Sequence, residues 1–182
     1  MKELETKRLI LREWKLSDSK AMYEYAKNEL VGPSAGWSPH VNEEESKEII
    51  QMFIDNQDNW ALIFKEDKKV IGSIGLHNRS PLDGESDLKQ REIGYVLSPK
   101  YWGMGIMPEA VEEIIRYSFE ELGLDLIWCG HYDFNSNSRR VIEKTGFKYR
   151  FTKERILERL NNRKVDTLYY SIIKAEYILN RG

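Results

Sequence analysis

Two glycines separated by a single residue, Gly103 and Gly105, join an extended apolar segment to an amphipathic one. Pro108 follows at a spacing that suits the first turn of a helix, where its missing N–H costs no hydrogen bond. A strand-to-helix turn of this kind directs several unpaired backbone N–H groups toward one point, and the helix dipole adds positive potential there. The segment therefore predicts a phosphate-binding site, and Lys100 is close enough in sequence to add positive charge.

Three interpretations of this turn compete. The glycines alone allow a tight turn without any ligand, because glycine tolerates positive φ. A dinucleotide-binding turn is disfavoured at two places: Pro108 stands where that motif has its third glycine or alanine, and Asp125, the acidic residue at a suitable distance, opens a strand instead of ending one. The third interpretation is a cradle for the pyrophosphate of coenzyme A.

The flanking residues carry a family resemblance that favours the third interpretation. Lys100-x-x-Gly103-x-Gly105 resembles the Arg/Gln-x-x-Gly-x-Gly/Ala signature of GNAT-superfamily N-acetyltransferases. Three segments resemble the RimJ/RimL-like branch of this superfamily, which comprises the ribosomal-protein N-terminal acetyltransferases. The segments are Glu92-Ile93-Gly94-Tyr95, Glu109-Ala110 and Asn135-x-x-Ser138-Arg139-Arg140-Val141-Ile142-Glu143-Lys144-Thr145-Gly146-Phe147. The similarity also includes the opening residues 6–12 and the closing residues 166–171, so it covers nearly the whole chain in the family's order.

This resemblance implies acetyl-coenzyme A as the co-substrate. Its pantetheine arm would lie between two splayed strands and pair with backbone groups, as an added strand would. Asn135 would hydrogen-bond that arm, although it suits a helix N-cap equally well, and the basic helix residues after it would meet phosphates or simply face solvent. Met107 departs from the small residue that the family often has. The implied cofactor-binding residues are Leu97, Lys100, Trp102, Gly103, Met104, Gly105, Ile106, Met107, Asn135, Ser138 and Arg139, with Arg140 and Lys144 as further basic candidates.

Acetyl transfer requires a neutral amine, and primary amines are mostly protonated near neutral pH. Glu92, on the strand that leads into the turn, is the candidate to take the amine's proton, directly or through a water; an exposed carboxylate without such a role is the alternative. Many family members supply a tyrosine for the departing thiolate seven residues after the asparagine, but that residue here is Ile142. Ser138 is the candidate instead, with a structural serine as the alternative. Transfer would be direct, without a covalent enzyme intermediate.

The acceptor is poorly determined by the sequence. Trp37 and His40, in a Gly/Pro-containing loop, and His77, at a strand end, are expected to border its pocket; a loop anchor and surface imidazoles are the alternatives. The resemblance favours the α-amine of a protein N-terminus, with ribosomal proteins among the candidates. Polyamines, amino acids and aminoglycosides stay open, because one scaffold serves many amines. A coenzyme A-binding regulator without turnover is the alternative function.

Composition excludes several other classes. A formal charge of −2 gives no excess of positive charge for nucleic-acid binding. The single cysteine, Cys129, excludes an intramolecular disulfide and a CxxC site, and we expect it to be a buried packing residue. The three histidines are too scattered to predict a metal site. The polar N-terminus and the lack of a long apolar run predict a cytoplasmic protein. The oligomeric state is not fixed, and a homodimer stays open.

The elements that must position these residues follow from apolar periodicity and breakers. Loops are expected at 31–40 and 78–90, and a cap at Asn42 begins a helix through Ile54. The other expected helices are 17–25, 106–122, 135–146 and a short tail to 179, and the expected strands are 6–14, 60–64, 69–77, 91–98, 126–131, 147–151 and 166–174. We predict a single α/β (α+β) domain over 1–182. The resemblance implies the GNAT-like acyl-CoA N-acyltransferase fold, a mixed sheet of about seven strands, splayed between 91–98 and 126–131.

Overall fold

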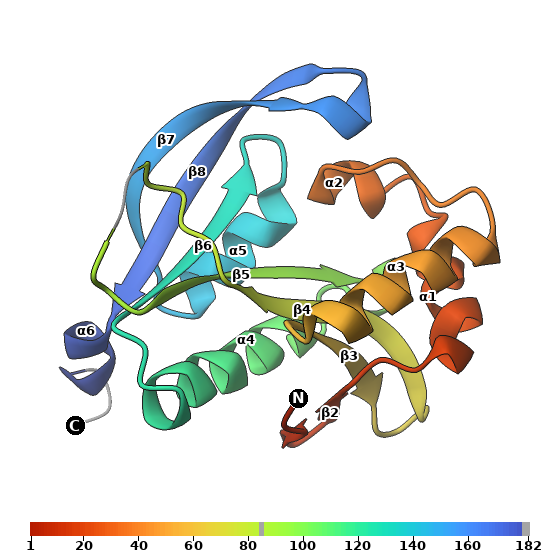
Figure 1. Ribbon diagram of the computed structural model, residues 1–182, viewed down its shortest axis with the longest axis horizontal. Helices are drawn as coiled ribbons and strands as arrows, with labels where there is room; N and C mark the ends of the chain where they lie inside the picture. Colours follow the sequence, from red (N-terminus) through yellow and green to blue (C-terminus); the bar gives the residue numbers. More distant parts are fainter. Residues whose placement is uncertain (84–85, 180–182) are drawn as a thin grey trace.

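A computed structural model of the chain describes residues 1–83 and 86–179, and one mixed sheet forms its centre. The sheet has eight strands in the order β1-β2-β3-β4-β5-β6-β8-β7 (Figure 1). The strands are β1 (Leu4–Glu5), β2 (Leu9–Arg12), β3 (Asn59–Phe64), β4 (Lys69–His77), β5 (Gln90–Leu97), β6 (Leu126–Tyr132), β7 (Lys148–Leu157) and β8 (Arg163–Ile173). All neighbouring pairs are antiparallel except β5 and β6, which are parallel.

Helices cover both faces of the sheet. They are α1 (Ser19–Ala26), α2 (Gly32–Ala35), α3 (Glu43–Asn56), α4 (Ile106–Arg116), α5 (Ser136–Lys144) and α6 (Lys174–Leu179). Side chains of β3 alternate between the two faces of the sheet. Ala61 and Ile63 pack with residues of α1 and α3 on one face, while Leu62 and Phe64 belong to the core that contains α4 on the other. No helix among the described residues is long and apolar enough to cross a bilayer.

Local sequence explains where the longer helices begin. The side chain of Asn42 accepts a hydrogen bond from the backbone N–H of Glu45 at 2.8 Å, which caps α3 as expected. Three glutamates then occupy the first turn of α3, where the helix dipole favours negative charge. Helix α4 turns one apolar face to the core, made of Ile106, Met107, Ala110, Val111, Ile114 and Ile115.

The parallel strands β5 and β6 separate partway along their length. Their pairing runs from Gln90 opposite Leu126 to Ile93 opposite Cys129. Beyond these positions β5 continues from residue 94 to 97 and β6 from residue 130 to 132 without pairing to each other. This arrangement confirms the predicted splay, and it leaves one edge of β5 open beside the turn that leads to α4.

Several expected boundaries were wrong. The eighth strand is β1, whose two residues are too few to produce a periodic pattern, and residues 6–8 form the reversal between it and β2. The loop 31–40 contains the helical turn α2. The last part of the expected helix 106–122 is a π-helical turn, Tyr117–Glu121, where the Ser118 hydroxyl donates to the carbonyl of Ile114 at 2.6 Å and so competes with the backbone ladder. Two residues of the 78–90 connection, 84 and 85, lie outside the described residues.

Candidate active site

The glycine turn has the geometry that an anion site needs. Gly103 and Gly105 adopt φ values of +76° and +71°, a region that other residues enter only with strain. Gly105 is the N-cap of α4, which begins at Ile106. Residues 103–105 are exposed, so the N–H groups of the first helical turn, which have no partner within the helix, can reach a ligand. The turn therefore fits the diphosphate of coenzyme A, with Lys100 exposed nearby.

An ion pair fixes this turn to the start of the chain. The carboxylate of Glu109 accepts hydrogen bonds from the Thr6 hydroxyl at 2.5 Å, the Arg8 backbone N–H at 2.8 Å and Arg8 Nε at 2.7 Å. Arg8 Nη1 also donates to the carbonyl of Met104 at 2.8 Å. Burial opposes the charge of Glu109, but these hydrogen bonds outweigh it and lower the pKa of the carboxyl group. Arg8 and Glu109 thus hold both ends of the turn.

Trp102 connects the turn to the open edge of β5. Its Nε1 donates to the carbonyl of Leu97 at 2.8 Å, so the two predicted cofactor-binding residues contact each other. Met104 is exposed, whereas the side chains of Ile106 and Met107 are buried in the core. Met107 stands where the family often has a small residue, but its larger side chain points into the interior. It therefore leaves the backbone N–H donors of the turn accessible.

Ser138 lies at the splay, and Tyr95 joins it there. The Tyr95 hydroxyl lies 2.9 Å from Ser138 Oγ and also donates to the Ser138 carbonyl at 3.2 Å. Tyr95 belongs to the part of β5 that has left β6, so this contact joins β5 to α5 across the opening. Burial raises the pKa of Tyr95 well above its ordinary value, which keeps the phenol protonated. Strand alternation would have placed Tyr95 on this face, but the sequence analysis did not assign it a role.

The residues of α5 make mainly structural contacts. Asn135 Oδ1 accepts from the backbone N–H of Ser138 at 3.0 Å, as an N-cap does, and its Nδ2 donates to the carbonyl of Ser34 at 2.9 Å. Arg139 is exposed and pairs with Glu143 at 2.8 Å. Arg140 and Lys144 are exposed on the same helix. Their contacts with nucleotide phosphates stay predictions.

Cys129 is a packing residue, as expected. Its side chain is buried within β6 and belongs to the main core. Burial, with a smaller contribution from the charge of Glu92, raises the pKa of the Cys129 thiol far above its ordinary value. The thiolate that a nucleophile requires is therefore strongly disfavoured.

Glu92 and His77 lie on the opposite face of the splayed strands from Tyr95. They are direct partners in the β4–β5 register, so their side chains point to the same face. Arg79 contacts both carboxylate oxygens of Glu92, with Nε 2.9 Å from Oε2 and Nη2 3.3 Å from Oε1. The Glu92 side chain is only 12% exposed, which differs from an ordinary surface carboxylate. His77 Nδ1 lies 2.7 Å from Asp58 Oδ2, a partner that the sequence analysis missed.

The other two predicted acceptor residues stabilise the 31–40 loop. His40 is buried, and its Nδ1 lies 2.8 Å from the hydroxyl of Ser46 on α3. Burial lowers the pKa of His40, partly opposed by the charge of Glu45, which favours the neutral imidazole. The ring of Trp37 lies 5.1 Å from that of His40, between centroids. Within the described residues, no hydrogen bond, ion pair or ring contact joins Trp37 or His40 to Glu92 or His77.

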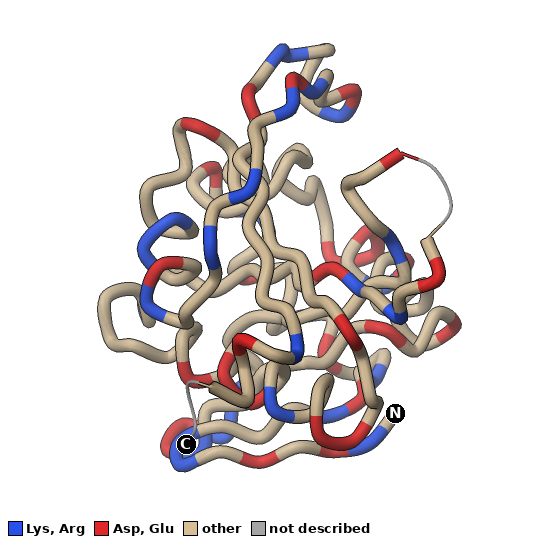
Figure 2. Tube along the Cα trace, turned by 90° about the vertical axis from the view of Figure 1, so that its left-hand side faces the viewer, with Lys and Arg blue, Asp and Glu red and all other residues tan. Residues whose placement is uncertain are grey.

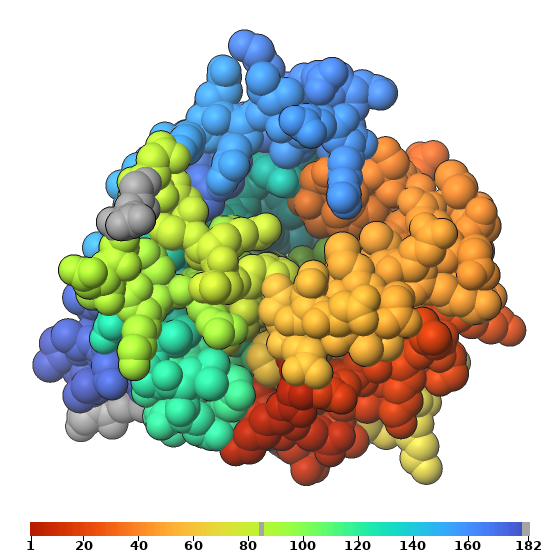
Figure 3. All heavy atoms as spheres, viewed as in Figure 1, coloured from red at the N-terminus to blue at the C-terminus, as the bar shows by residue number. Residues whose placement is uncertain are grey.

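A hollow opens on the face that carries Glu92 and His77. Figure 3 shows it between the β7–β8 hairpin, the segment after β4, and the α2–α3 region, with β6 visible at its floor. The ring of Tyr169 on β8 packs over Gly130 of β6, and its hydroxyl accepts from Arg155 Nη2 at 2.7 Å. Lys and Arg recur along the hairpin (Figure 2), and β7 carries Lys148, Arg150, Lys153 and Arg155. Sequence pattern could not show that the hairpin folds over this face.

The family model for the acetyltransferase (GNAT) domain matches residues 8–148 of the chain. This chain belongs to the GNAT acetyltransferase family. The N-acetyltransferase YoaA of Bacillus subtilis, described as uncharacterized, is 30% identical over 179 residues, which are 94% of this chain and 96% of YoaA. The GNAT family acetyltransferase of Bacillus anthracis has a similar structure, with a TM-score of 0.84 at 24% identity, covering 96% of this chain and 100% of that one.

Two other solved structures share this GNAT fold at lower identity. One is the ribosomal-protein-S5-alanine acetyltransferase of Vibrio fischeri, with a TM-score of 0.75 at 21% identity, covering 96% of this chain and 97% of that one. The other is the microcin C7 self-immunity acetyltransferase MccE in complex with acetyl-CoA and AMP, with a TM-score of 0.75 at 19% identity, covering 92% and 93%. The family assignment makes this protein an N-acetyltransferase, with acetyl-CoA as the acyl donor that the GNAT fold uses. No cluster of metal-ligating side chains occurs among residues 1–83 and 86–179.

Proposed function

We propose that this GNAT enzyme transfers acetyl from acetyl-CoA to a primary amine by direct attack while both substrates are bound. The observation that carries this proposal is the separation of β5 from β6 beyond Ile93. The glycine turn, which is the proposed anion site, lies at the end of β5. Ser138 lies on one face of the opening, whereas Glu92 lies on the other face. Donor and acceptor can therefore approach one point from opposite faces of the sheet.

The proposed cofactor contacts follow from this geometry. Backbone N–H groups of residues 103–107 bind the diphosphate, assisted by Lys100. The open edge of β5 near Leu97 pairs with the pantetheine arm, which places the thioester beside Tyr95 and Ser138. Ser138 hydrogen-bonds the departing thiolate, and the neutral Tyr95 hydroxyl orients it. Asn135 and Arg139 complete the site toward the nucleotide end.

On the acceptor face, Glu92 is the proposed acceptor of the first proton. A primary ammonium must lose a proton before its nitrogen can attack. The half-enclosed carboxylate of Glu92 attracts the ammonium group and removes that proton, directly or through a water. Trp37 and His40 shape this side indirectly, because they hold the loop that closes one end of the hollow.

For the acceptor we propose the α-amine of a protein N-terminus, in the manner of the RimJ/RimL-like branch. The motifs around Glu92 and Asn135–Phe147 support it, and the fold shared with the ribosomal-protein-S5-alanine acetyltransferase is consistent with it. Polyamines, free amino acids and aminoglycosides are the alternative acceptors. We also propose that the enzyme acts in the cytoplasm; the homodimer stays a prediction.

A panel of amines tests the activity. Purified protein is offered acetyl-CoA with peptides that begin with Ser or Ala, polyamines, amino acids and aminoglycosides, and products are identified by mass spectrometry while free coenzyme A is measured. We expect an acetylated α-amine on the peptides. Binding of acetyl-CoA without acetylation of any amine would favour the non-catalytic regulator.

A matched pair of glycine variants tests the cofactor site. Gly103 and Gly123 both have positive φ, +76° and +65°, and a Cβ at either position would contact nothing within 4 Å. Gly103→Ala and Gly123→Ala should therefore cost similar stability, about 1 kcal/mol each. Only Gly103→Ala should weaken acetyl-CoA binding in calorimetry. Equal affinity in both variants would exclude the turn as the diphosphate site.

A further inference from the structure

The imidazole of His77 is held in one orientation by a carboxylate. Asp58 lies between α3 and β3, and its Oδ2 is 2.7 Å from His77 Nδ1. The β3–β4 register explains the contact, because Asn59 pairs with Gly75 and the carbonyl of Asp58 accepts from the N–H of Leu76 at 2.8 Å. An ionised carboxylate can only accept, so Nδ1 donates to Asp58 and the neutral ring keeps its free lone pair on Nε2.

That free nitrogen lies over two glycines at the opening of the sheet. A Cβ added to Gly75 would lie 2.4 Å from His77 Nε2 and 2.9 Å from Asn59 Nδ2, and one added to Gly94 would lie 3.4 Å from Nε2. Gly94 is the first residue of β5 beyond its pairing with β6. The ring therefore reaches along the sheet surface from the level of Glu92 to the point where the strands separate, and the two glycines provide the space.

We infer that His77 is a second proton acceptor of the transfer, positioned by Asp58. This inference rests on the proposed function. A primary ammonium gives up two protons before it becomes an amide, and Glu92 is proposed to take the first. As the amine nitrogen bonds to the acetyl carbon, the second proton moves from nitrogen to His77 Nε2. The C–S bond breaks, the sulfur leaves with the bonding electron pair, and the Nδ1 proton stays hydrogen-bonded to Asp58.

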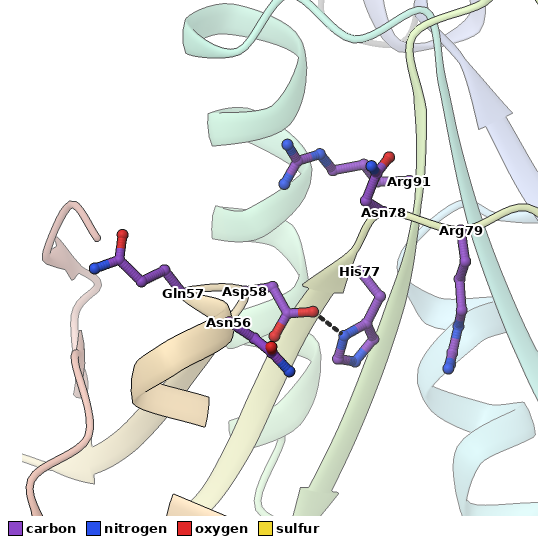
Figure 4. Close-up of a pocket in the computed structure, with 7 residues that line it drawn as sticks. All are labelled: Asn56, Gln57, Asp58, His77, Asn78, Arg79 and Arg91. Carbon is purple, nitrogen blue, oxygen red and sulfur yellow. Dashed lines mark hydrogen bonds and ion pairs between the residues drawn. The ribbon is translucent and has the colours of Figure 1, made fainter. Parts of the chain in front are cut away.

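The surroundings of the pair allow the proton to leave. A pocket of about 510 Å³ adjoins it, lined by Asn56, Asp58, His77, Asn78, Arg79 and Arg91 among others (Figure 4). The charged groups around the imidazole are Asp58 from the turn before β3, Glu92 and Arg91 from β5, and Arg79 from the segment after β4. Water in this pocket would carry the proton from His77 to solvent after each turnover.

Replacement of His77 by Asn tests the role of Nε2 separately from the hydrogen bond that Nδ1 makes to Asp58. The amide of Asn can still donate to Asp58, but it offers no proton acceptor where Nε2 lies. We expect His77→Asn to lower kcat about 100-fold, the low end for a general base, with unchanged acetyl-CoA affinity in calorimetry. The pH dependence of kcat in the variant should differ from that of the native enzyme, because the variant lacks the imidazole as a proton acceptor.

Asp58→Asn provides an independent test of the positioning residue. It should lower kcat less than His77→Asn and leave the KM for acetyl-CoA unchanged. The matched control is Asp55→Asn, an exposed aspartate of α3 that accepts from Gln51, which should leave kcat unchanged. Wild-type kcat and pH dependence in both His77→Asn and Asp58→Asn would overturn the inference while acetylation by the native enzyme stands. Failure of the native enzyme to acetylate any amine would instead remove the proposed function and the inference with it.

Discussion

At the scale of single residues, burial decides which groups of this site can react. Cys129 and Tyr95 lie near each other between β5, β6 and α5, and burial is the largest cause of the raised pKa of each. Both groups therefore stay protonated, one as a packing thiol and the other as a hydrogen-bonding phenol. Glu92, on the other face of β5, keeps a charge partner in Arg79.

Cys129 should react with a thiol reagent only when the protein unfolds. The side chain is 1% exposed and its thiolate is disfavoured by burial, so the native protein should release almost no chromophore from a disulfide reagent over minutes. One equivalent should react in denaturant, because Cys129 is the single cysteine. Rapid stoichiometric reaction of the native protein would contradict the buried position.

Ser138→Ala and Tyr95→Phe should affect turnover to different degrees. Ser138→Ala removes the hydroxyl proposed to face the thiolate, and we expect kcat to fall about 10- to 100-fold. Tyr95→Phe keeps that hydroxyl and removes only its partner at 2.9 Å, so kcat should fall less. The acetyl-CoA affinity of both variants, measured by calorimetry, should stay close to that of the native enzyme. An unchanged kcat in Ser138→Ala would exclude its role toward the thiolate.

The sequence predicted the types of the site residues better than their partners. Glu92, His77 and Ser138 could be chosen because a motif or a strand end contains them. Asp58 and Arg79 could not, because a contact between residues 58 and 77 depends on the β3–β4 register and on the bulge between Leu62 and Ile63. His40 was selected because its loop was expected to border the acceptor pocket, and its contact with Ser46 depends on how that loop packs on α3.

At the scale of elements, a half-buried ion pair between Arg8 and Glu109 joins the N-terminal segment to the start of α4. The Glu109 carboxylate is 19% exposed and accepts three hydrogen bonds from Thr6 and Arg8. Those bonds outweigh burial and hold the pKa of Glu109 below its ordinary value of 4.5. The contribution to stability is therefore complete above that value and is lost as the pH falls through the folded-state pKa.

Glu109→Gln should destabilise the protein at pH 7 by about 1 to 2 kcal/mol, because hydrogen bonds to a charged acceptor are lost. The difference from the native protein should shrink as the pH falls below 4.5 in urea unfolding experiments. Glu112→Gln, an exposed glutamate of the same helix, is the matched control and should change stability little. A difference that stays constant from pH 7 down to the acid unfolding of the protein would show that the charge of Glu109 is not responsible.

The longer helices and strands could be predicted from the sequence because their capping residues and apolar periodicity agree with how they pack in the fold. Asn42 with the glutamates after it defines the start of α3, and β4 was predicted with its observed bounds, Lys69–His77. The hairpin strands β7 and β8 were predicted too short. Their outer part, which ends in the turn at Glu158–Leu160, projects beyond the core and is largely exposed, so it lacks the apolar alternation that identifies a strand.

At the scale of the whole molecule, the proposed cofactor site includes the open edge of the sheet, so ligand binding should report on both. Residues 94–97 of β5 have left β6, and the proposed pantetheine arm would occupy that edge. Ligand that binds only the folded state stabilises it by about 2.7 kcal/mol at a free concentration 100 times Kd. For a chain of this size, we expect acetyl-CoA to raise Tm by about 5 to 10 °C.

Hydrogen exchange can locate that stabilisation within the sheet. Saturating acetyl-CoA should slow exchange most at the amides of residues 94–97 and 103–107, because the first group lies on the open strand edge and the second is proposed to bind the diphosphate. Strand β3 is paired on both sides, by β2 and β4. The exchange rates of its amides should therefore fall only as much as the increase in global stability requires. Slower exchange confined to β7 and β8, with none at the turn, would place the ligand on the hairpin and contradict the proposed cofactor site.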